Sequence, residues 1–534
     1  MSKAKTVSGK AFDFGLLKRV MLYVKPYKGK FLLTALLTII LAILGPVKPL
    51  LIGETIDRFV ITGDPEGLLN WTIIIVVFLF LEGILQFYQT YEANVLGQSV
   101  VIDVRAKLFD HLNSFRLKFF DGTPIGTLVT RVISDIQTIG EIFSQGLLII
   151  IGDILKLTVV IAYMFYMDWR LAALSVASIP LLLIATNIFK NAIKKAFTQV
   201  RAQVAKLNAF VQEHVTGMSI VQIFNREEIE FDRFTRINQN HKKAHVSSIW
   251  ANSIFFPVVE ILSSVSIAFL VWYGVKGVVQ ETFTFGVLFQ FILLIHMLFR
   301  PIRQLADRFN VLQMGMVGSE RVFSLLDSEE HMEDKGGIAA ASFKGSITFK
   351  DVHFAYIDKE YVLKGLSFSV KPGETVAFVG ATGAGKTSVI NLLSRMYAYQ
   401  GGEIRIDDTS IEEFTLSTLR QNIAVVLQDV FLFSDSIYNN ITLKDTSISK
   451  QKVIEAAKAV GAHSFIMNLP GNYDYNVKER GGMLSSGQRQ LIAFIRAYVY
   501  NPSILILDEA TSSIDTESEL IIQKAIEELT RGRI

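Results

Sequence analysis

Eight consecutive residues in the last third of the chain have the types and spacing of a phosphate-binding loop. They read Gly380-Ala381-Thr382-Gly383-Ala384-Gly385-Lys386-Thr387 and lie between an apolar run, Thr375–Val379, predicted to be a strand, and a helix predicted from Lys386. Glycines let backbone N–H groups turn towards phosphate oxygens, and the start of a helix adds partial positive charge. Lys386 can reach the β- and γ-phosphates of a nucleotide, and the Thr387 hydroxyl can ligate Mg²⁺. A Gly-rich turn arising by chance would not have strand, lysine, hydroxyl and helix in register.

Two adjacent carboxylates, Asp508 and Glu509, follow the apolar run Ile504-Leu505-Ile506-Leu507. Four consecutive apolar residues indicate a strand of a buried parallel sheet. At its carboxyl end Asp508 could bind Mg²⁺ through water, and Glu509 could polarise the water that attacks a phosphate. The carboxylate pair is weak evidence alone and becomes strong beside the phosphate loop upstream.

A third small-residue turn also precedes a predicted helix. It reads Leu484-Ser485-Ser486-Gly487-Gln488. Such a turn can bind an anion through the N–H groups of the helix terminus. Taken alone, it could equally serve only to cap its helix.

The composition indicates that these motifs belong to a membrane protein. Of 534 residues, 50% are hydrophobic and only 19% are charged, and the mean hydropathy is +0.38. This excess of apolar residues excludes a disordered chain and argues against a purely soluble enzyme. The chain has no cysteine, which excludes disulfides, thiolate zinc sites and a cysteine nucleophile. A net charge of +3 is too small to indicate a nucleic-acid partner.

The apolar residues concentrate in the first two thirds of the chain. Each apolar stretch is long enough to cross a bilayer, if the first is one helix kinked at Gly45-Pro46. We therefore predict an all-α membrane domain over 1–326, a polar linker over 327–342, and an α/β P-loop nucleotide-binding domain over 343–534. The six predicted spans lie near 31–60, 69–95, 140–167, 169–190, 249–275 and 283–303.

Charge orients the spans. The N-terminal segment and the long segments between spans 2 and 3 and between spans 4 and 5 are rich in Lys and Arg, which places them and both termini in the cytosol. The N-terminus lacks the pattern of a signal peptide, and Lys18–Lys30 is predicted to be a short interfacial elbow. Both long cytosolic segments are predicted to extend the spans as helices, with tips at Asp121–Pro124 and near Asn225–Glu228.

Charged residues within the predicted spans allow two interpretations. Asp153 and Lys156 lie three apart, on one face of span 3. They could form an internal ion pair that orients the bundle, or they could line a substrate cavity. The other candidates of this kind are Lys48, Glu54, Glu82 and Glu260.

The three motifs, in this order and after six spans, resemble those of ATP-binding cassette (ABC) exporter half-transporters, over nearly the whole chain. The resemblance implies ATP and Mg²⁺ as cofactors, with Thr387, Gln428 and Asp508 at the metal. It implies catalytic roles for Glu509, Lys386 and Gln428, and adenine stacking for Tyr356. The nucleotide site would extend to Ser388. The turn Leu484–Gln488 would be the signature that binds ATP held by the opposite subunit, and Asp515 would end the D-loop that links the two sites. The element Glu479-Arg480-Gly481 would contact coupling helices, which the tip segments near Phe119–Thr123 and Arg226–Phe231 resemble.

Two departures from the family pattern stand out. Ser486 replaces the first glycine of the signature pair, which restricts φ and fills space near the phosphate. Since some similar exporters pair two different subunits and weaken one signature, both a heterodimer and a homodimer are open. The family also places a switch histidine roughly thirty residues after Asp-Glu. Here the last histidine is His463, before the signature, and the chain ends at Ile534. We expect a sequence cut short before that residue.

The resemblance implies ATP-driven export of a lipid or drug-like amphiphile across the cytoplasmic (inner) membrane by a multi-pass dimer of half-transporters. The expected partners are a second half-transporter subunit, the bilayer and a small amphiphilic substrate, with no nucleic acid. An alternative is a non-transporting ABC protein in which ATP gates a channel or regulates a partner. A soluble P-loop ATPase tethered to the membrane is a weaker alternative.

Overall fold

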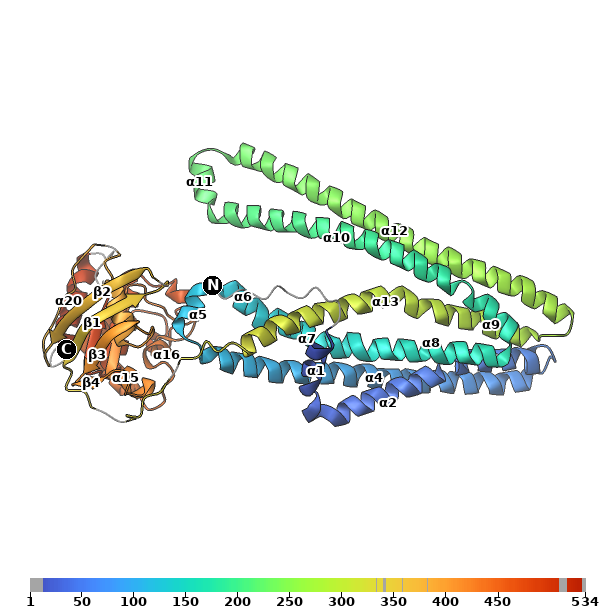
Figure 1. Cartoon of the computed structure of the whole chain (residues 1–534), viewed down its shortest axis with the longest axis horizontal. Coiled ribbons are helices and arrows are strands. Elements are labelled where there is room, and N and C mark those ends of the chain that lie inside the picture. Colours follow the sequence, from blue (N-terminus) through green and yellow to red (C-terminus); the bar gives the residue numbers. More distant parts are fainter. Residues whose placement is uncertain are drawn as a thin grey trace. The chain divides into compact units, whose positions relative to one another are not determined.

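The computed structural model describes residues 13–332, 334–339, 342–357, 359–381, 383–508 and 516–530. Contacts between Cα atoms divide the chain into two compact units (Figure 1). The first, the helical unit, comprises the residues up to Leu112 together with Gly126–Ser328. The second, the α/β unit, comprises Asn113–Ile125 and the residues from Glu329. The first predicted cytosolic tip therefore belongs with the nucleotide-binding domain and not with the spans.

The described residues of the first unit fold into helices joined by short turns, because its apolar runs satisfy their backbone groups within each segment. Among the described residues, six helical segments are long and apolar enough to cross a membrane, as predicted. These segments are Lys25–Val60, Pro65–Asn113, Ile125–Met167, Trp169–Phe189, Glu227–Val279 and Phe285–Leu326. The named helices that the chain forms here are α1 (Phe14–Leu22), α2 (Lys28–Leu44), α3 (Val47–Thr55), α4 (Pro65–Asn113), α6 (Ile125–Thr130), α7 (Ile136–Glu141), α8 (Leu147–Met167), α9 (Trp169–Val176), α10 (Ile179–Thr216), α11 (Met218–Ile223), α12 (Glu227–Val279) and α13 (Phe285–Leu326).

The first span is interrupted between α2 and α3, where the sequence predicts a kink. Gly45 ends α2, and Pro46 is the N-cap of α3. A Cβ atom on Gly45 would lie 3.2 Å from the Ala42 carbonyl oxygen and 3.3 Å from Lys156 Cε. A glycine at the break therefore lets α8 approach closely.

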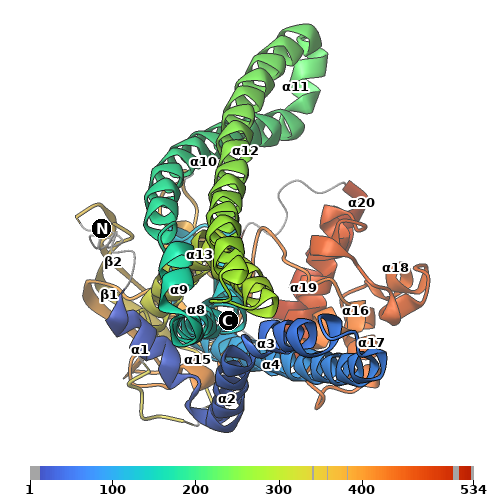
Figure 2. The ribbon, with the colours of Figure 1, turned by 90° about the vertical axis from the view of Figure 1, so that its right-hand side faces the viewer.

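The second predicted cytosolic tip is a helical hairpin. Helices α10 and α12 lie side by side and are joined through the short α11 (Figures 1 and 2). Asn225 has a positive φ of 51° in the turn between α11 and α12, close to the predicted break. The exposed side chains of α11 and this turn are strongly apolar, since Ile223 is 78% and Phe224 69% exposed.

The elbow predicted at Lys18–Lys30 overlaps the short helix α1, which begins earlier, at Phe14, and is tied to the end of α13. The Arg19 guanidinium donates two hydrogen bonds, of 2.5 and 2.6 Å, to the Asp327 carboxylate. It also lies 4.3 Å from the centre of the Phe323 ring, against which Tyr23 stacks. Bidentate pairs of this kind fix orientation as well as adding energy.

The α/β unit contains two sheets. The larger is antiparallel, in the order β2 (Tyr361–Val370), β1 (Ile347–Ala355), β3 (Gly401–Ile406), β4 (Thr409–Ser410). The smaller pairs β5 (Ile423–Val426) in parallel with β6 (Ile504–Leu507), which confirms the parallel strand predicted before Asp508. The helices are α5 (Leu117–Gly122), α14 (Lys386–Leu393), α15 (Leu416–Asn422), α16 (Ile437–Thr442), α17 (Lys450–Ala459), α18 (His463–Met467), α19 (Ser486–Tyr500) and α20 (Thr516–Thr530).

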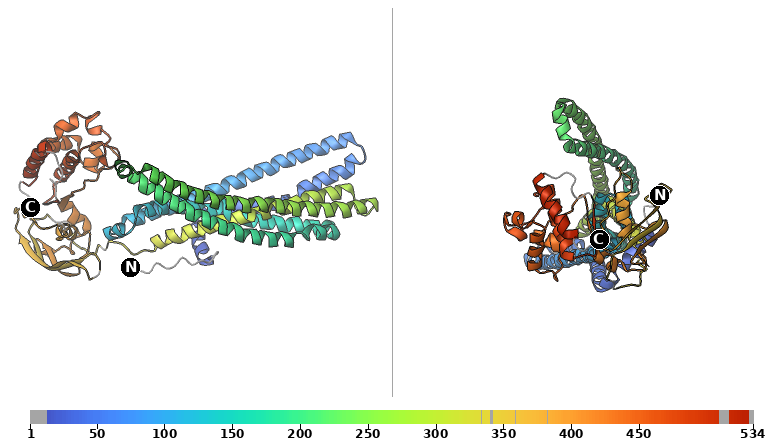
Figure 3. Two further views of the ribbon diagram at one scale, coloured as in Figure 1. Left: turned by 90° about the horizontal axis from the view of Figure 1, so that it is seen from above. Right: turned by 90° about the vertical axis from the view of Figure 1, so that its left-hand side faces the viewer.

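Two hydrophobic cores hold this unit together. One lies between the larger sheet and α14 and buries Phe349, Ile404 and Leu392. The other surrounds α19, whose Phe494 is fully buried. Figure 3 shows the larger sheet, in gold, apart from the helical part with α19 and α20, in orange to red. The phosphate loop leads into α14, which packs in the first core, and Leu484 of the signature turn lies in the second.

The strand predicted at Thr375–Val379 is not found, so that prediction is wrong. A strand needs a neighbour to accept and donate its ladder hydrogen bonds. Here the segment lines one wall of a cavity of about 370 Å³ whose other wall includes β6. Without an adjacent strand among the described residues, Phe378 is 45% and Val379 95% exposed.

The described residues of the predicted polar linker pair through their backbone with two other segments. His331 forms an antiparallel bridge with Phe115, just before α5. Its neighbours extend this pairing, since the Arg116 N–H donates to the Glu330 carbonyl at 3.0 Å and the two side chains form a 2.6 Å ion pair. Further along, Ile338 pairs in parallel with Phe414. The linker thus joins the first cytosolic tip to the α/β unit.

Candidate nucleotide-binding site

The phosphate loop has the backbone shape that its glycines predict. Gly383 and Gly385 have φ values of +86° and +92°, a region that L side chains rarely adopt. A Cβ on Gly385 would also lie 2.9 Å from Leu363 Cδ2. Gly385 is the N-cap of α14, and no side chain caps that helix. The helix terminus is therefore open to an anion.

Lys386 follows this turn as the first residue of α14. Its ammonium donates a 3.0 Å hydrogen bond to the carbonyl oxygen of Gly380, at the other end of the loop. The lysine side chain is thereby folded back over the loop, which places its charge where a phosphate would lie. Of the other predicted loop residues, Ala381 and Ala384 are described by the structure, whereas Thr382 lies outside the described residues.

Thr387 and Asp508 come together as the metal prediction requires. The Thr387 hydroxyl donates to Asp508 Oδ2 at 3.1 Å. Asp508 directly follows β6, and its N–H bonds the Val426 carbonyl at 2.9 Å. Because β5 and β6 are parallel, Gln428, two residues after β5, leaves the same sheet edge as Asp508.

These donors fit a hard cation such as Mg²⁺, which prefers oxygen ligands and usually takes one or two carboxylates plus substrate phosphates. The described part of the chain holds no group of three or more His, Asp or Glu that could form a metal site. A cation bound by Thr387 and Asp508 would take further oxygen ligands, such as those of a phosphate. Glu509 and Asp515 lie outside the described residues.

Tyr356, the predicted adenine-stacking residue, is half-buried beside α14. Its hydroxyl lies 3.1 Å from the Ser388 hydroxyl and accepts a 3.1 Å hydrogen bond from Asn391. The ring meets Phe354 and Tyr397 edge to face. Ser388, predicted to bind nucleotide, has a buried side chain whose hydroxyl lies beside that of Tyr356, and its N–H donates a 3.1 Å hydrogen bond to the Gly385 carbonyl.

The signature turn is a helix cap. Ser485 accepts the Gln488 N–H at 3.2 Å, and Gln488 Oε1 accepts the Ser485 N–H at 3.0 Å, a reciprocal capping box. Leu484 and Gly487 are buried. Ser486 is exposed as the first residue of α19. Ser485 therefore caps α19, as one of the two interpretations predicts, and Ser486 lies at the surface.

Sequence reasoning missed Tyr397, which connects this site to the first cytosolic tip. Its hydroxyl donates a short hydrogen bond to the Asp121 carboxylate at the end of α5. Burial and this carboxylate raise the pKa of Tyr397 well above its usual range. Asp121 and Tyr397 are 276 residues apart, so no local pattern could have paired them.

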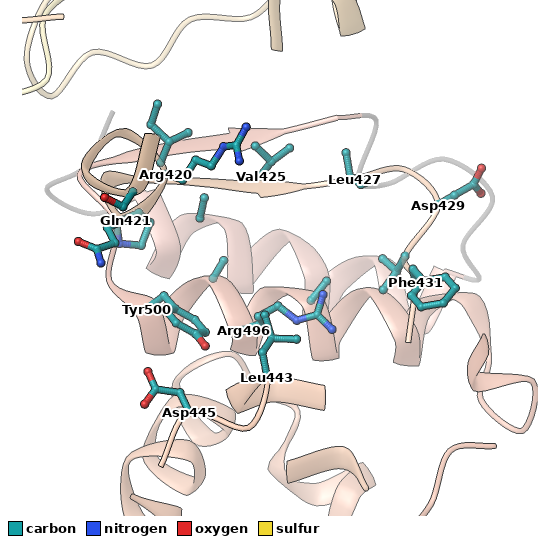
Figure 4. Close-up of a pocket in the computed structure, with 17 residues that line it drawn as sticks. Arg420, Gln421, Val425, Leu427, Asp429, Phe431, Leu443, Asp445, Arg496 and Tyr500 are labelled. Atoms are coloured by element: carbon teal, nitrogen blue, oxygen red, sulfur yellow. The ribbon is translucent and has the colours of Figure 1, made fainter. Parts of the chain in front are cut away.

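A cavity of about 680 Å³ opens between β5 and α19. Figure 4 shows Arg496 and Leu443 projecting into it, with Phe431 at one end. Arg496 Nε donates to the Asn440 carbonyl at 3.0 Å, whereas its Nη2 is buried with no hydrogen-bond partner in the described part of the chain. Burial lowers the pKa of Arg496. The lining of the cavity is therefore mixed, with apolar side chains such as Leu443 and Phe431 and charged ones such as Asp429 and Arg496.

Comparisons with known proteins agree with this arrangement. Residues 31–302 match the ABC transporter transmembrane region family, and residues 363–512 match the ABC transporter family. An uncharacterised ABC transporter ATP-binding protein of Bacillus subtilis (strain 168), YknV, is 37% identical over 534 residues, covering 98% of this chain and 87% of the relative.

Two further relatives are named ATP-dependent lipid A-core flippase. The protein from Syntrophus aciditrophicus (strain SB) is 32% identical over 97% of this chain and 86% of its own length. The protein from Desulfotalea psychrophila (strain LSv54 / DSM 12343) is 34% identical over 97% of this chain and 91% of its own length. With a transmembrane region and an ATP-binding domain in one multi-pass polypeptide, the chain belongs to the ABC transporter family, among the exporter half-transporters.

Proposed function

We propose that the protein exports an amphiphilic or hydrophobic substrate, lipid or drug-like, by ATP-driven alternating access as a dimer of half-transporters. The observation that carries this proposal is the Thr387–Asp508 contact beside the Lys386 loop, in a chain that also holds six helices able to span a membrane. The names of the two flippases support a lipid-like substrate. The location would be the cytoplasmic (inner) membrane, with both termini in the cytosol.

Each residue of the site would have a distinct task. Lys386 and the N–H groups of α14 would bind and orient the phosphates. Thr387, Gln428 and Asp508 would hold Mg²⁺, which when bound offsets phosphate charge. Glu509 would orient the attacking water and accept its proton. Ser485–Gln488 would contact ATP bound to the partner subunit, so closure of the dimer would complete each site.

The cavity beside α19 would receive the tip of a coupling segment from the partner subunit. The exposed apolar side chains of Ile223 and Phe224 would contact the apolar part of its lining, such as Leu443 and Phe431, and the Nη2 of Arg496 would donate to a backbone carbonyl. Closure of the two ATPase domains would then move the spans.

Substrate-stimulated ATPase activity in proteoliposomes tests this function. We expect lipids or drug-like amphiphiles to raise ATP turnover, because cargo binding favours the state that hydrolyses ATP. Turnover that no amphiphile changes, together with an ATP-gated ion current, would support the channel alternative. High ATPase activity that does not depend on protein concentration would support a tethered monomeric ATPase.

Substitution of Ser486 by glycine is expected to raise ATPase activity of the homodimer by about two- to fivefold, which corresponds to roughly 0.5–1 kcal/mol of barrier. The reason is that the hydroxymethyl group occupies space where the partner's phosphate would lie. Ser485→Gly is the matched control, since it removes the capping hydroxyl and should lower activity. An unchanged rate in Ser486→Gly would remove the main support for a degenerate site in a heterodimer.

Substitution of Leu443 by aspartate is expected to lower substrate stimulation by about tenfold while basal ATPase activity persists, because a charge in the cavity opposes an apolar tip. Leu443 is 47% exposed with φ of 49°, a conformation that aspartate tolerates, so the fold should survive. Met467→Asp, at a similarly exposed methionine outside the cavity lining, is the control. Equal stimulation in the two variants would refute docking at this cavity.

A further inference from the structure

A cluster of aromatic and charged side chains joins the two long helices just before the second cytosolic tip. His214 lies in the last turn of α10, and Glu230 lies in the first turn of α12. The connection between them is α11 with its flanking turns. His214 and Glu230 side chains are only 16% and 19% exposed. None of the nucleotide-site residues takes part in this cluster.

Both ring nitrogens of His214 face acceptors. Nδ1 lies 2.8 Å from the carbonyl oxygen of Phe210, and Nε2 lies 2.8 Å from the carboxylate oxygen of Glu230. A carbonyl oxygen and an ionised carboxylate can only accept hydrogen bonds. A neutral imidazole has one N–H and would satisfy one of these contacts, whereas the imidazolium satisfies both. The geometry therefore selects the protonated form of His214.

The surroundings stabilise the positive charge further. The Phe210 ring stacks on the imidazole, with centroids 3.7 Å apart and an angle of 16° between the planes. An aromatic face attracts a cation at this distance. Glu230 also accepts 2.9 Å hydrogen bonds from Arg233, which lies one turn further along α12.

The charged groups that face His214 are few. Glu213 on α10 and Glu230 on α12 favour the imidazolium, and Arg233 on α12 shares the carboxylate of Glu230. The six residues of α11, Met-Ser-Ile-Val-Gln-Ile, carry no titratable side chain. The hydrogen bond to Glu230, followed by the one to Phe210, raises the pKa of His214 above its ordinary value of 6.5.

The raised pKa of His214 determines how the link between α10 and α12 depends on pH. A group whose pKa is raised in the folded state stabilises it fully below the ordinary pKa and loses this contribution as the pH rises through the raised pKa. The link between α10 and α12 is therefore intact below about pH 6.5 and weakens through the near-neutral range above it. The cytosolic side of a membrane works within that range.

We propose that His214 is a positioning residue that, as the imidazolium, holds α10 and α12 together at the base of α11, so that coupling of ATP hydrolysis to transport declines as the pH rises. The pH-dependent contact between α10 and α12 does not depend on the proposed function, whereas the effect on coupling rests on it. Deprotonation breaks one of two hydrogen bonds and lets the α11 tip move on its own.

A spin label on α11 tests the proposal. The chain has no native cysteine, so Gln222→Cys, at an exposed position of α11, gives one labelling site in the full-length protein. In proteoliposomes between pH 6 and 9 we expect the mobility of the nitroxide to rise with a single midpoint above pH 6.5. In the His214→Gln background that midpoint should disappear, because the amide does not titrate.

Two further variants keep the test independent of folding. Glu230→Gln retains an acceptor but removes the charge, and should lower the midpoint by about one pH unit. His241→Gln, further along α12, should leave the midpoint unchanged. A pH-independent wild-type spectrum, or a midpoint that persists in His214→Gln, would overturn the proposal. The spectra need no substrate, so a failure to transport at any pH would refute the proposed function without moving this midpoint.

Discussion

Replacement of Glu509 by glutamine is expected to reduce ATP turnover by about 10²- to 10⁴-fold, the usual contribution of a positioned general base. Glutamine has the same shape but cannot accept the proton of the attacking water. ATP binding should persist, because Lys386 and the phosphate loop are untouched. The variant should therefore accumulate a closed dimer with ATP bound, detectable by nucleotide retention after rapid gel filtration.

Glu455→Gln is the matched control for that experiment. Glu455 lies exposed on α17, where its carboxylate accepts a hydrogen bond from Gln451 and has no part in the nucleotide site. Its turnover should equal that of the wild type. Wild-type turnover in Glu509→Gln would show that another group activates the water and that the catalytic role belongs elsewhere.

Replacement of Lys386 by alanine should weaken ATP binding by about 10- to 100-fold, since a hydrogen bond to a charged group contributes about 1.5–3 kcal/mol. The loop itself should keep its shape, because Gly383 and Gly385 set the backbone turn independently of the lysine. Equilibrium binding of a fluorescent ATP analogue measures this loss. Turnover should fall with it.

Lys458→Ala removes an exposed lysine from the last turn of α17 and leaves the phosphate loop intact. It should bind ATP as the wild type does. If Lys386→Ala also kept wild-type affinity, the position of its ammonium against the Gly380 carbonyl would be unrelated to phosphate binding.

The sequence predicts the parts of this fold that local patterns control. Long apolar runs predict helices able to span a membrane, and six are found among the described residues. The phosphate-loop motif predicts a Gly-rich turn that leads into a helix from Lys386, and Gly385 and α14 provide it. The apolar run before Asp508 predicts a parallel strand, and β6 is one.

Features that depend on distant neighbours could not be predicted. Thr375–Val379 has the composition of a buried strand, yet a strand also needs an adjacent partner, and the described residues place a cavity beside it. The Tyr397–Asp121 hydrogen bond joins residues 276 positions apart. The pairing of His331 with Phe115 places the first cytosolic tip in the α/β unit, although the sequence groups it with the membrane helices.

In the candidate site, too, some features follow from local sequence patterns and others depend on packing between distant segments. Residue types and spacing predict that Thr387 and Asp508 both bind Mg²⁺. The structure places their side chains 3.1 Å apart, and the role at a metal stays a prediction. Residue types and spacing do not predict that Ser388 turns its hydroxyl to Tyr356, because that contact depends on how α14 packs against β1. Roles for Glu509, Asp515 and the signature turn remain proposals.

Vectorial transport tests the central claim most directly. The purified protein is reconstituted in proteoliposomes, ATP is supplied only on the side of the nucleotide-binding domains, and movement of a fluorescent lipid or amphiphilic dye is measured. We predict ATP-dependent movement away from the side that holds ATP, and none in Glu509→Gln. ATP hydrolysis at an undiminished rate without net movement of any amphiphile, or equal movement in wild type and Glu509→Gln, would contradict ATP-driven export.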